Sequence, residues 1–213
     1  RRNGADRDIW TMDPANPGSN RQLVQNSGGG WGVSDWSPDD KQLLMAQFIS
    51  VNQSHLWLVD AATGAVTRLT PEGRDSVAWA GGTFARDGRG VYVTTDQGSE
   101  FRRLAYIELA SRRVTPLTAD IPWDVDEFDL SPDGKTIAFT ANEAGQSKLY
   151  LFDTATRRHR AVTNLPAGQV FALTWHPRGK DLGFTVNSSR STSDAYSLDA
   201  QTGEITRWTE SEL

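Results

Sequence analysis

The sequence predicts an all-β fold in which one four-stranded unit is repeated. Three landmarks recur in step: a tight turn after an aromatic residue or Leu, a short apolar strand that ends in an acid, and a strand that closes on Thr. The residues that lead into the turn, here called anchors, are Trp36, Phe84, Leu130 and Trp175. They recur every 45–48 residues. Four short strands in such a period are typical of propeller blades, so we expect a β-propeller of four complete blades after an N-terminal half-blade.

The turn is clearest at residues 131–134, which read Ser-Pro-Asp-Gly. Proline fixes φ near −65° and glycine accepts a positive φ at little cost, so this sequence favours a tight turn. The run from Thr136 to Thr140 that follows is β-prone and has the length of a strand. Related turns precede similar runs at residues 37–40, 85–88 and 176–179. In each unit, therefore, the first strand ends at the anchor and the second strand follows the turn.

The third and fourth strands have their own landmarks. The third strand ends in an acid, at Asp60, Glu108, Asp153 and Asp199. The fourth strand closes on threonine, at Thr70, Thr118, Thr163 and Thr209. Together the landmarks predict blades at about residues 31–70, 79–118, 125–163 and 170–209.

Residues 8–25 match only the second half of a unit. Asp13 stands where the third strand should end, and residues 21–24 match a fourth strand. The first two strands are missing, and residues 210–213 offer no strand that could replace them. Because open sheet edges invite pairing, we expect further blades upstream in a parent chain or association with another copy through the open half-blade.

Bulk composition excludes several classes of protein. A net charge of −5 gives no basic field for nucleic acid, and no apolar run approaches the ~20 residues that a membrane helix needs. The chain has no cysteine, so it has no disulfide, cysteine-ligated zinc or thiol nucleophile. We expect no cofactor and no metal.

No catalytic residue is predicted. The nucleophile motif Gly-x-Ser-x-Gly is absent, and the nearest match, residues 32–36, lacks the second glycine. The three histidines are His55, His159 and His176. Each falls at a strand start, in a hairpin or in a repeated turn, which indicates structural roles. We interpret the 213 residues as a propeller segment, 1–213, without a catalytic hydrolase domain.

An acidic run at residues 124–129 is the first candidate binding feature. Strand alternation places Asp124 and Asp126 on one face and Glu127 with Asp129 on the other. The carboxylates could be a solvated strand start, could bind a peptide amine, or could hold Ca²⁺ through oxygen ligands. The spacing of a calcium-binding EF-hand loop is absent.

Tryptophans and arginines near the expected loops are the second feature. Trp31, Trp79 and Trp123 each lie shortly before an anchor, where they would either contact a second domain or ligand or fill gaps between blades. Arg102 and Arg103 flank the loop between second and third strands, where they would be solvated or would bind a carboxylate. The candidate contact residues are Trp31, Trp79, Trp123, Asp124, Asp126, Glu127, Arg102 and Arg103.

The repeat resembles the TolB-type propeller repeat over essentially the whole chain. Longer phrases at residues 57–64, 99–106, 121–125 and 206–212 resemble the propeller of bacterial prolyl-oligopeptidase-family serine peptidases of the acylaminoacyl or dipeptidyl type. This resemblance implies that an α/β-hydrolase domain follows and performs catalysis through a serine acyl-enzyme. The propeller would restrict access and help to bind short peptides. The alternative is a stand-alone TolB-like propeller that binds a protein partner. The compartment, bacterial periplasm or cytoplasm, stays open.

Overall fold

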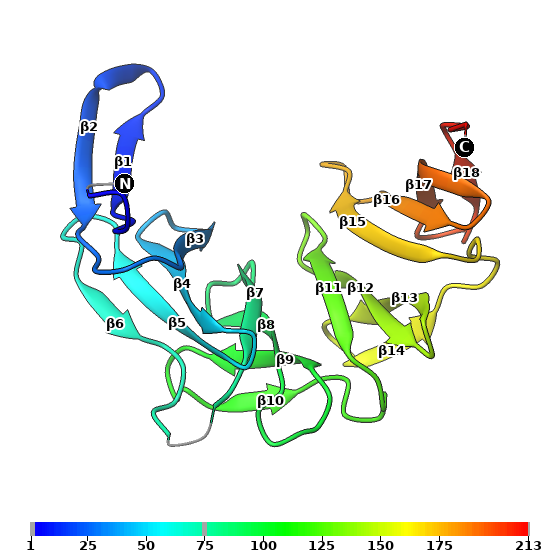
Figure 1. Cartoon of the computed structure of the whole chain (residues 1–213), viewed down its shortest axis with the longest axis horizontal. Helices are drawn as coiled ribbons and strands as arrows, with labels where there is room; N and C mark the ends of the chain where they lie inside the picture. Colours follow the sequence, from blue (N-terminus) through cyan, green and yellow to red (C-terminus); the bar gives the residue numbers. More distant parts are fainter. Residues whose placement is uncertain (1–2, 74–75, 213) are drawn as a thin grey trace. The chain divides into compact units, whose positions relative to one another are not determined.

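The computed structural model describes residues 3–73 and 76–212. These residues form eighteen strands and no helix, and the strands make five antiparallel sheets (Figure 1). The described part of the chain contains no helix long and apolar enough to span a membrane.

Each sheet is built from consecutive strands. Sheet N contains β1 (Ile9–Asp13) and β2 (Asn16–Val24). Sheet I contains β3 (Trp31–Trp36), β4 (Gln42–Ser50), β5 (Gln53–Asp60) and β6 (Val66–Arg68). Sheet II contains β7 (Trp79–Phe84), β8 (Gly90–Thr95), β9 (Arg103–Glu108) and β10 (Val114–Pro116). Sheet III contains β11 (Val125–Leu130), β12 (Thr136–Glu143), β13 (Gln146–Asp153) and β14 (Arg158–Ala161). Sheet IV contains β15 (Gln169–Trp175), β16 (Asp181–Ser188), β17 (Ser191–Asp199) and β18 (Ile205–Arg207).

The turn after the first strand is held by side chains that the motif supplies. The Ser131 hydroxyl donates to Asp133 Oδ1 at 2.6 Å and accepts the backbone N–H of Thr136 at 3.0 Å. Gly134 has a φ of 73°, in the region that glycine adopts most readily. The second strand therefore begins at a fixed point after the anchor.

The acid at the end of the third strand closes the next turn. Asp60 Oδ1 accepts the backbone N–H of Ala62 at 3.1 Å, and both the N–H at 2.7 Å and the hydroxyl at 2.8 Å of Thr63. These bonds favour the charged carboxylate, with the Thr63 N–H foremost, and lower the pKa of Asp60. Asp153 makes the same bonds in sheet III. The acidic landmark is thus a turn-forming residue.

The chain forms two compact units. Unit 1 comprises residues 1–99 and 104–116, and unit 2 comprises residues 100–103 and 117–213. Within unit 1, one core joins Leu44, Leu58 and Leu69 of sheet I to Phe84 and Val91 of sheet II. Within unit 2, an equivalent core joins Ala138 and Leu151 of sheet III to residues of sheet IV. Each unit therefore contains a pair of sheets with a shared apolar core.

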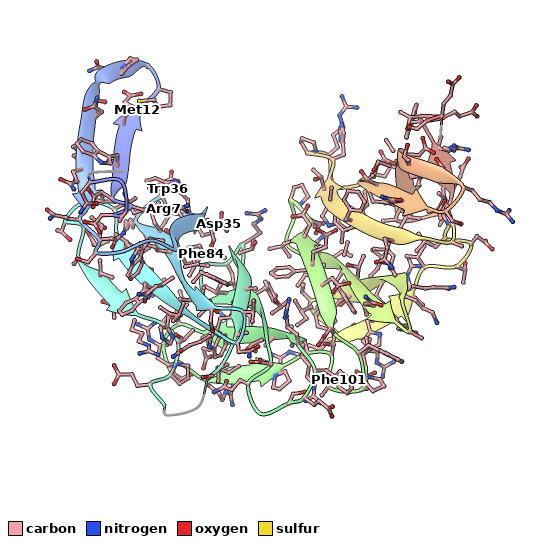
Figure 2. All side chains as sticks on the ribbon, in the orientation of Figure 1. Arg7, Met12, Asp35, Trp36, Phe84 and Phe101 are labelled. Carbon is pink, nitrogen blue, oxygen red and sulfur yellow. The ribbon has the colours of Figure 1, made fainter. Side chains whose placement is uncertain are left out.

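A carboxylate clasps the first strands of neighbouring sheets in both units. Asp35 Oδ2 in β3 accepts the backbone N–H of Phe84 in β7 at 2.8 Å (Figure 2). In unit 2, Asp129 Oδ2 in β11 accepts the backbone N–H of Trp175 in β15, also at 2.8 Å. In both cases the accepting aspartate directly precedes the anchor of one sheet, and the donating N–H belongs to the anchor of the next sheet. The backbone N–H groups of the buried anchors Phe84 and Trp175 therefore each have a partner in the adjacent sheet.

Arginines at matching repeat positions add a second clasp. Arg21 Nη2 of sheet N donates to the carbonyl of Ala61 in sheet I at 2.6 Å. Arg160 Nη2 of sheet III donates to the carbonyl of Ala200 in sheet IV at 2.9 Å. Both carbonyls directly follow the acid that ends a third strand. The same arrangement thus joins sheet N to sheet I and sheet III to sheet IV.

Within sheet IV, one buried carboxylate in β17 is bonded to β18 and to the segment after it. Asp194 is 1% exposed and accepts bonds from Ser191, from Arg207 Nη2 at 2.6 Å, and from Thr209 Oγ1 at 3.0 Å. These bonds, with the Ser191 hydroxyl foremost, hold the pKa of Asp194 far below its usual value.

Removal of the unit 2 clasp tests its contribution. We expect Asp129→Ala to lower the free energy of unfolding by about 1–3 kcal/mol, because the N–H of the nearly buried Trp175 loses its acceptor. Urea unfolding followed by tryptophan fluorescence measures the change. Asp129→Asn keeps an acceptor oxygen and should lose less. The control is Thr174→Ala, at the equivalent position of sheet IV. An Asp129→Ala variant no less stable than this control would contradict the assignment.

Candidate functional site

In each unit, the loops that lead into first strands lie beside the hairpins between second and third strands. We call the surface formed by these segments the loop face. In unit 1 the Phe48 N–H donates to the carbonyl of Gly30 at 2.9 Å. Gly30 has a φ of +81°, and a Cβ there would lie 2.3 Å from the Phe48 carbonyl oxygen, so glycine is required. In unit 2 the Val125 N–H donates to the carbonyl of Arg102 at 2.8 Å.

The loop face of unit 1 carries an exposed apolar hairpin end. Phe48 is 57% exposed, Ile49 48% and Val51 77%. We call these three residues the apolar tip. They continue the same strand and hairpin as Leu43 and Met45, which are buried. The sequence analysis missed the apolar tip. The sequence could have indicated it, because the apolar residues of this strand continue beyond the buried positions Leu43 to Met45.

The loop face of unit 2 carries a charged group. Asp124 Oδ1 accepts the Arg102 N–H at 2.7 Å, and the Asp124 carbonyl accepts the Asn142 N–H at 3.1 Å. Burial raises the pKa of Asp126, the negative charge of Asp124 raises it further, and the Arg102 guanidinium opposes the shift. We call Arg102, Asp124 and Asp126 the polar cluster. It brings both signs of charge together beside Trp123, which is 37% exposed.

Glu127 lies between sheets III and IV. Its Oε1 accepts the backbone N–H of Leu173 at 3.3 Å. Burial raises the pKa of Glu127, and the negative charges of Asp126 and Asp129 add to the shift. The pKa values of Asp126 and Glu127 are therefore both raised, which means that the fold holds these carboxylates in places unfavourable to their charge. Such residues are candidates for a functional role.

The three tryptophans have different surroundings. Trp31 begins β3, donates from Nε1 to the Ser27 carbonyl at 3.0 Å, and lies 5.9 Å from the Trp57 ring between centroids. Trp79 begins β7 and is 4% exposed, and its backbone N–H donates to Ser54 Oγ at 2.6 Å. These placements favour the packing alternative for Trp31 and Trp79. Trp123 retains a surface for contact.

The remaining candidate, Arg103, and the three histidines have the following surroundings. Arg103 is half-buried at the start of β9. His159 Nε2 lies 2.9 Å from Asp120 Oδ2, His55 Nδ1 lies 3.0 Å from Arg68 Nη2, and His176 Nδ1 accepts the Arg178 N–H at 3.2 Å. Burial, with the charge of Arg68, lowers the pKa of His55. Within residues 3–73 and 76–212, no three His, Asp or Glu side chains are grouped so that they could hold a metal ion.

Comparison with known proteins shows the fold. No protein-family model matches the sequence, and no curated protein matches it. Among solved structures, TolB from Acinetobacter baumannii aligns with 100% of this chain at 21% identity and a TM-score of 0.74. A prolyl endopeptidase aligns with 95% of the chain at 14% identity and a TM-score of 0.77. A Mycobacterium tuberculosis puromycin-hydrolyzing peptidase aligns with 91% at 14% identity and a TM-score of 0.75.

The chain has the fold of propeller blades. Its structural neighbours are TolB-like propellers and the N-terminal propeller of prolyl endopeptidases and puromycin hydrolases, as the repeat predicted. The chain spans 51% of the TolB chain and 30% of each of the two peptidase chains.

The raised pKa values give a stability prediction. Glu127→Gln keeps the oxygen that accepts the Leu173 N–H and removes the buried charge. A carboxyl group whose folded-state pKa is raised destabilises the fold once it ionises. We therefore expect the variant to unfold at a higher urea concentration than the natural chain at pH 7, and the difference to vanish below about pH 4. Asp126→Asn should behave alike. A difference that does not change between pH 7 and pH 4 would contradict this explanation.

Proposed function

We propose that the chain is the non-catalytic propeller segment of a serine peptidase of the prolyl-oligopeptidase family. In this proposal sheets I to IV are complete blades and sheet N is a half-blade of a ring that contains further strands. A following hydrolase domain performs acyl transfer to water through a serine acyl-enzyme. The propeller restricts access to that domain and helps to bind short peptides.

The observation that carries the proposal is the exposure of the apolar tip on the loop face. Phe48, Ile49 and Val51 lie together at one hairpin end and expose 48–77% of their surface. Apolar residues grouped at a surface are typical of sites that contact another protein or domain. The fold likeness to peptidase propellers makes a hydrolase domain the natural partner for this surface.

The polar cluster supports the peptide-binding part of the proposal. A short peptide carries an ammonium group at one end and a carboxylate at the other. The Asp126 carboxylate can pair with the ammonium group, the Arg102 guanidinium can pair with the carboxylate, and the exposed face of Trp123 can cover an apolar side chain. These groups would bind and orient a peptide, and they would take no part in bond cleavage.

The second candidate function is a stand-alone TolB-like propeller that binds a protein partner. It is favoured by the alignment of TolB with the whole of this chain. In that case the apolar tip would contact a separate protein instead of a domain of the same polypeptide.

The experiment that separates the two functions is a labelling of serine hydrolases in the source organism. A fluorophosphonate probe reacts with the serine of an active hydrolase, and an antibody against this chain isolates the protein for an intact mass. The proposal expects a labelled polypeptide much larger than 23.5 kDa. An unlabelled polypeptide near this mass would overturn it and favour the binding module.

The apolar tip gives a prediction for the parent enzyme. Because its side chains are exposed, Phe48→Ser with Val51→Ser should leave the thermal unfolding midpoint almost unchanged. Loss of apolar contact between the propeller and the hydrolase domain should let larger substrates reach the active site. We expect kcat/KM for an unfolded protein substrate to rise about 5-fold or more relative to a dipeptide amide, a change of ~1 kcal/mol. The control is Val66→Ser, which is also exposed but lies in β6. Equal ratios in the two variants would contradict a gating role.

A further inference from the structure

Unit 1 has a pocket on its loop face, where the loops of sheets I and II meet. The pocket has a volume of about 370 Å³, which is within the range of small-molecule sites. It is formed by the start of β5, the loop between β6 and β7, and the loop between β8 and β9. The Ser54 N–H donates to the carbonyl of Val77 at 3.1 Å, and the Ala78 N–H donates to Asp96 Oδ1 at 2.8 Å. These bonds join the three segments, so the pocket has fixed walls.

One side of the pocket is cationic. Arg68, at the end of β6, is half-buried, and its Cζ lies 5.9 Å from the centroid of the Trp57 ring. Its Nη2 donates to the carbonyl of Pro71 at 3.2 Å and lies 3.0 Å from His55 Nδ1. Within residues 3–73 and 76–212, Arg68 Nε is buried without a hydrogen-bond partner, and no carboxylate forms an ion pair with the guanidinium group. The positive charge of Arg68 is therefore open to a ligand carboxylate.

His55 adds a neutral hydrogen-bond donor to this side. A guanidinium group only donates, so His55 Nδ1 accepts from Arg68 and the neutral ring carries its proton on Nε2. Burial, and after it the charge of Arg68, lowers the pKa of His55, so the ring is neutral at pH 7. The Nε2–H group can then donate to an oxygen atom of a carboxylate that Arg68 binds.

The other residues of the pocket favour a ligand that carries both signs of charge. Glu72 and Asp96 line the pocket, and two carboxylates would repel a simple anion such as phosphate. Asp96 uses Oδ1 for the Ala78 N–H, which leaves Oδ2 to accept from an ammonium group. Val77 and Trp79 add apolar surface against which a side chain can pack.

We infer that this pocket binds a small molecule with both a carboxylate and an ammonium group, which is the chemistry of a short peptide or a free amino acid. The carboxylate pairs with Arg68 and His55, and the ammonium group pairs with Asp96. These residues belong to two complete sheets, so the pocket needs no further strands. It lies in unit 1, whereas the polar cluster lies in unit 2, and the inference does not require a hydrolase domain.

Isothermal titration calorimetry with dialanine and with alanine tests the inference. The natural chain should bind at least one of them with a Kd below about 1 mM, and the tighter ligand identifies the source as peptide or free amino acid. Converting the carboxylate of dialanine to an amide should weaken binding about tenfold or more, because the charge-assisted bonds to Arg68 are lost. Inorganic phosphate should not bind. Absence of binding by both dialanine and alanine would overturn the inference.

Variants assign the two ends of the ligand. Arg68→Gln should weaken the binding of dialanine about tenfold or more and remove the preference for dialanine over its amide. Asp96→Asn keeps the oxygen that accepts the Ala78 N–H, so it should fold, and it should weaken the binding of dialanine without weakening that of N-acetyl-dialanine. The control is Arg86→Gln, an exposed arginine in the turn after β7, which should bind like the natural chain.

Thermal unfolding of each variant is measured first, and Asp96→Asn decides the outcome if Arg68→Gln does not fold. Equal affinity for dialanine and its amide in the natural chain, or an Asp96→Asn variant that binds dialanine as the natural chain does, would overturn the inference. Binding that Arg102→Gln abolishes and Arg68→Gln does not would place the ligand at the polar cluster. That result would overturn this inference and leave the proposed function intact.

Discussion

A four-stranded sheet with two apolar faces cannot stand alone, and the rest of this structure depends on that constraint. In sheet I, Leu44 and Leu58 lie on one face and Met45 and Val59 on the other, and all four are buried. The first pair packs against sheet II and the second pair against sheet N. Face-to-face packing therefore determines which residues recur, and the clasp from Asp35 to the Phe84 N–H aligns the stacked sheets.

The same constraint separates structure from function along each repeat. The turns after the first and third strands are occupied by residues that close them, such as Ser131 and Asp60, and have little freedom to vary. The loop face carries fewer such demands, and there the sheets differ. Unit 1 has an apolar hairpin end at Phe48, and unit 2 has charged side chains at Arg102 and Asp124. Binding residues concentrate on such loops because a rigid scaffold positions them.

The sequence predicted features that depend on local chemistry. The anchors end the first strands and the acids end the third strands, because turns and hairpin closures involve residues only a few positions apart. Features that depend on packing between sheets were not predicted. The bond from the Trp79 backbone N–H to the Ser54 hydroxyl joins residues 25 positions apart. The bond from the Trp175 N–H to Asp129 joins residues 46 positions apart. The exposure of Phe48 was missed for the same reason, because the sequence of an apolar strand end is the same whether or not another sheet covers it.

Hydrogen exchange of the Phe84 and Trp175 amides tests most directly whether clasped, stacked sheets hold the fold together. Both N–H groups donate to a carboxylate of the preceding sheet, so they can exchange only when the sheets separate. The account predicts protection factors as high as those of the central strands β8 and β12. Exchange at the rate of the exposed hairpin at residues 49–52 would contradict it, because the sheets would then separate freely while each remained folded.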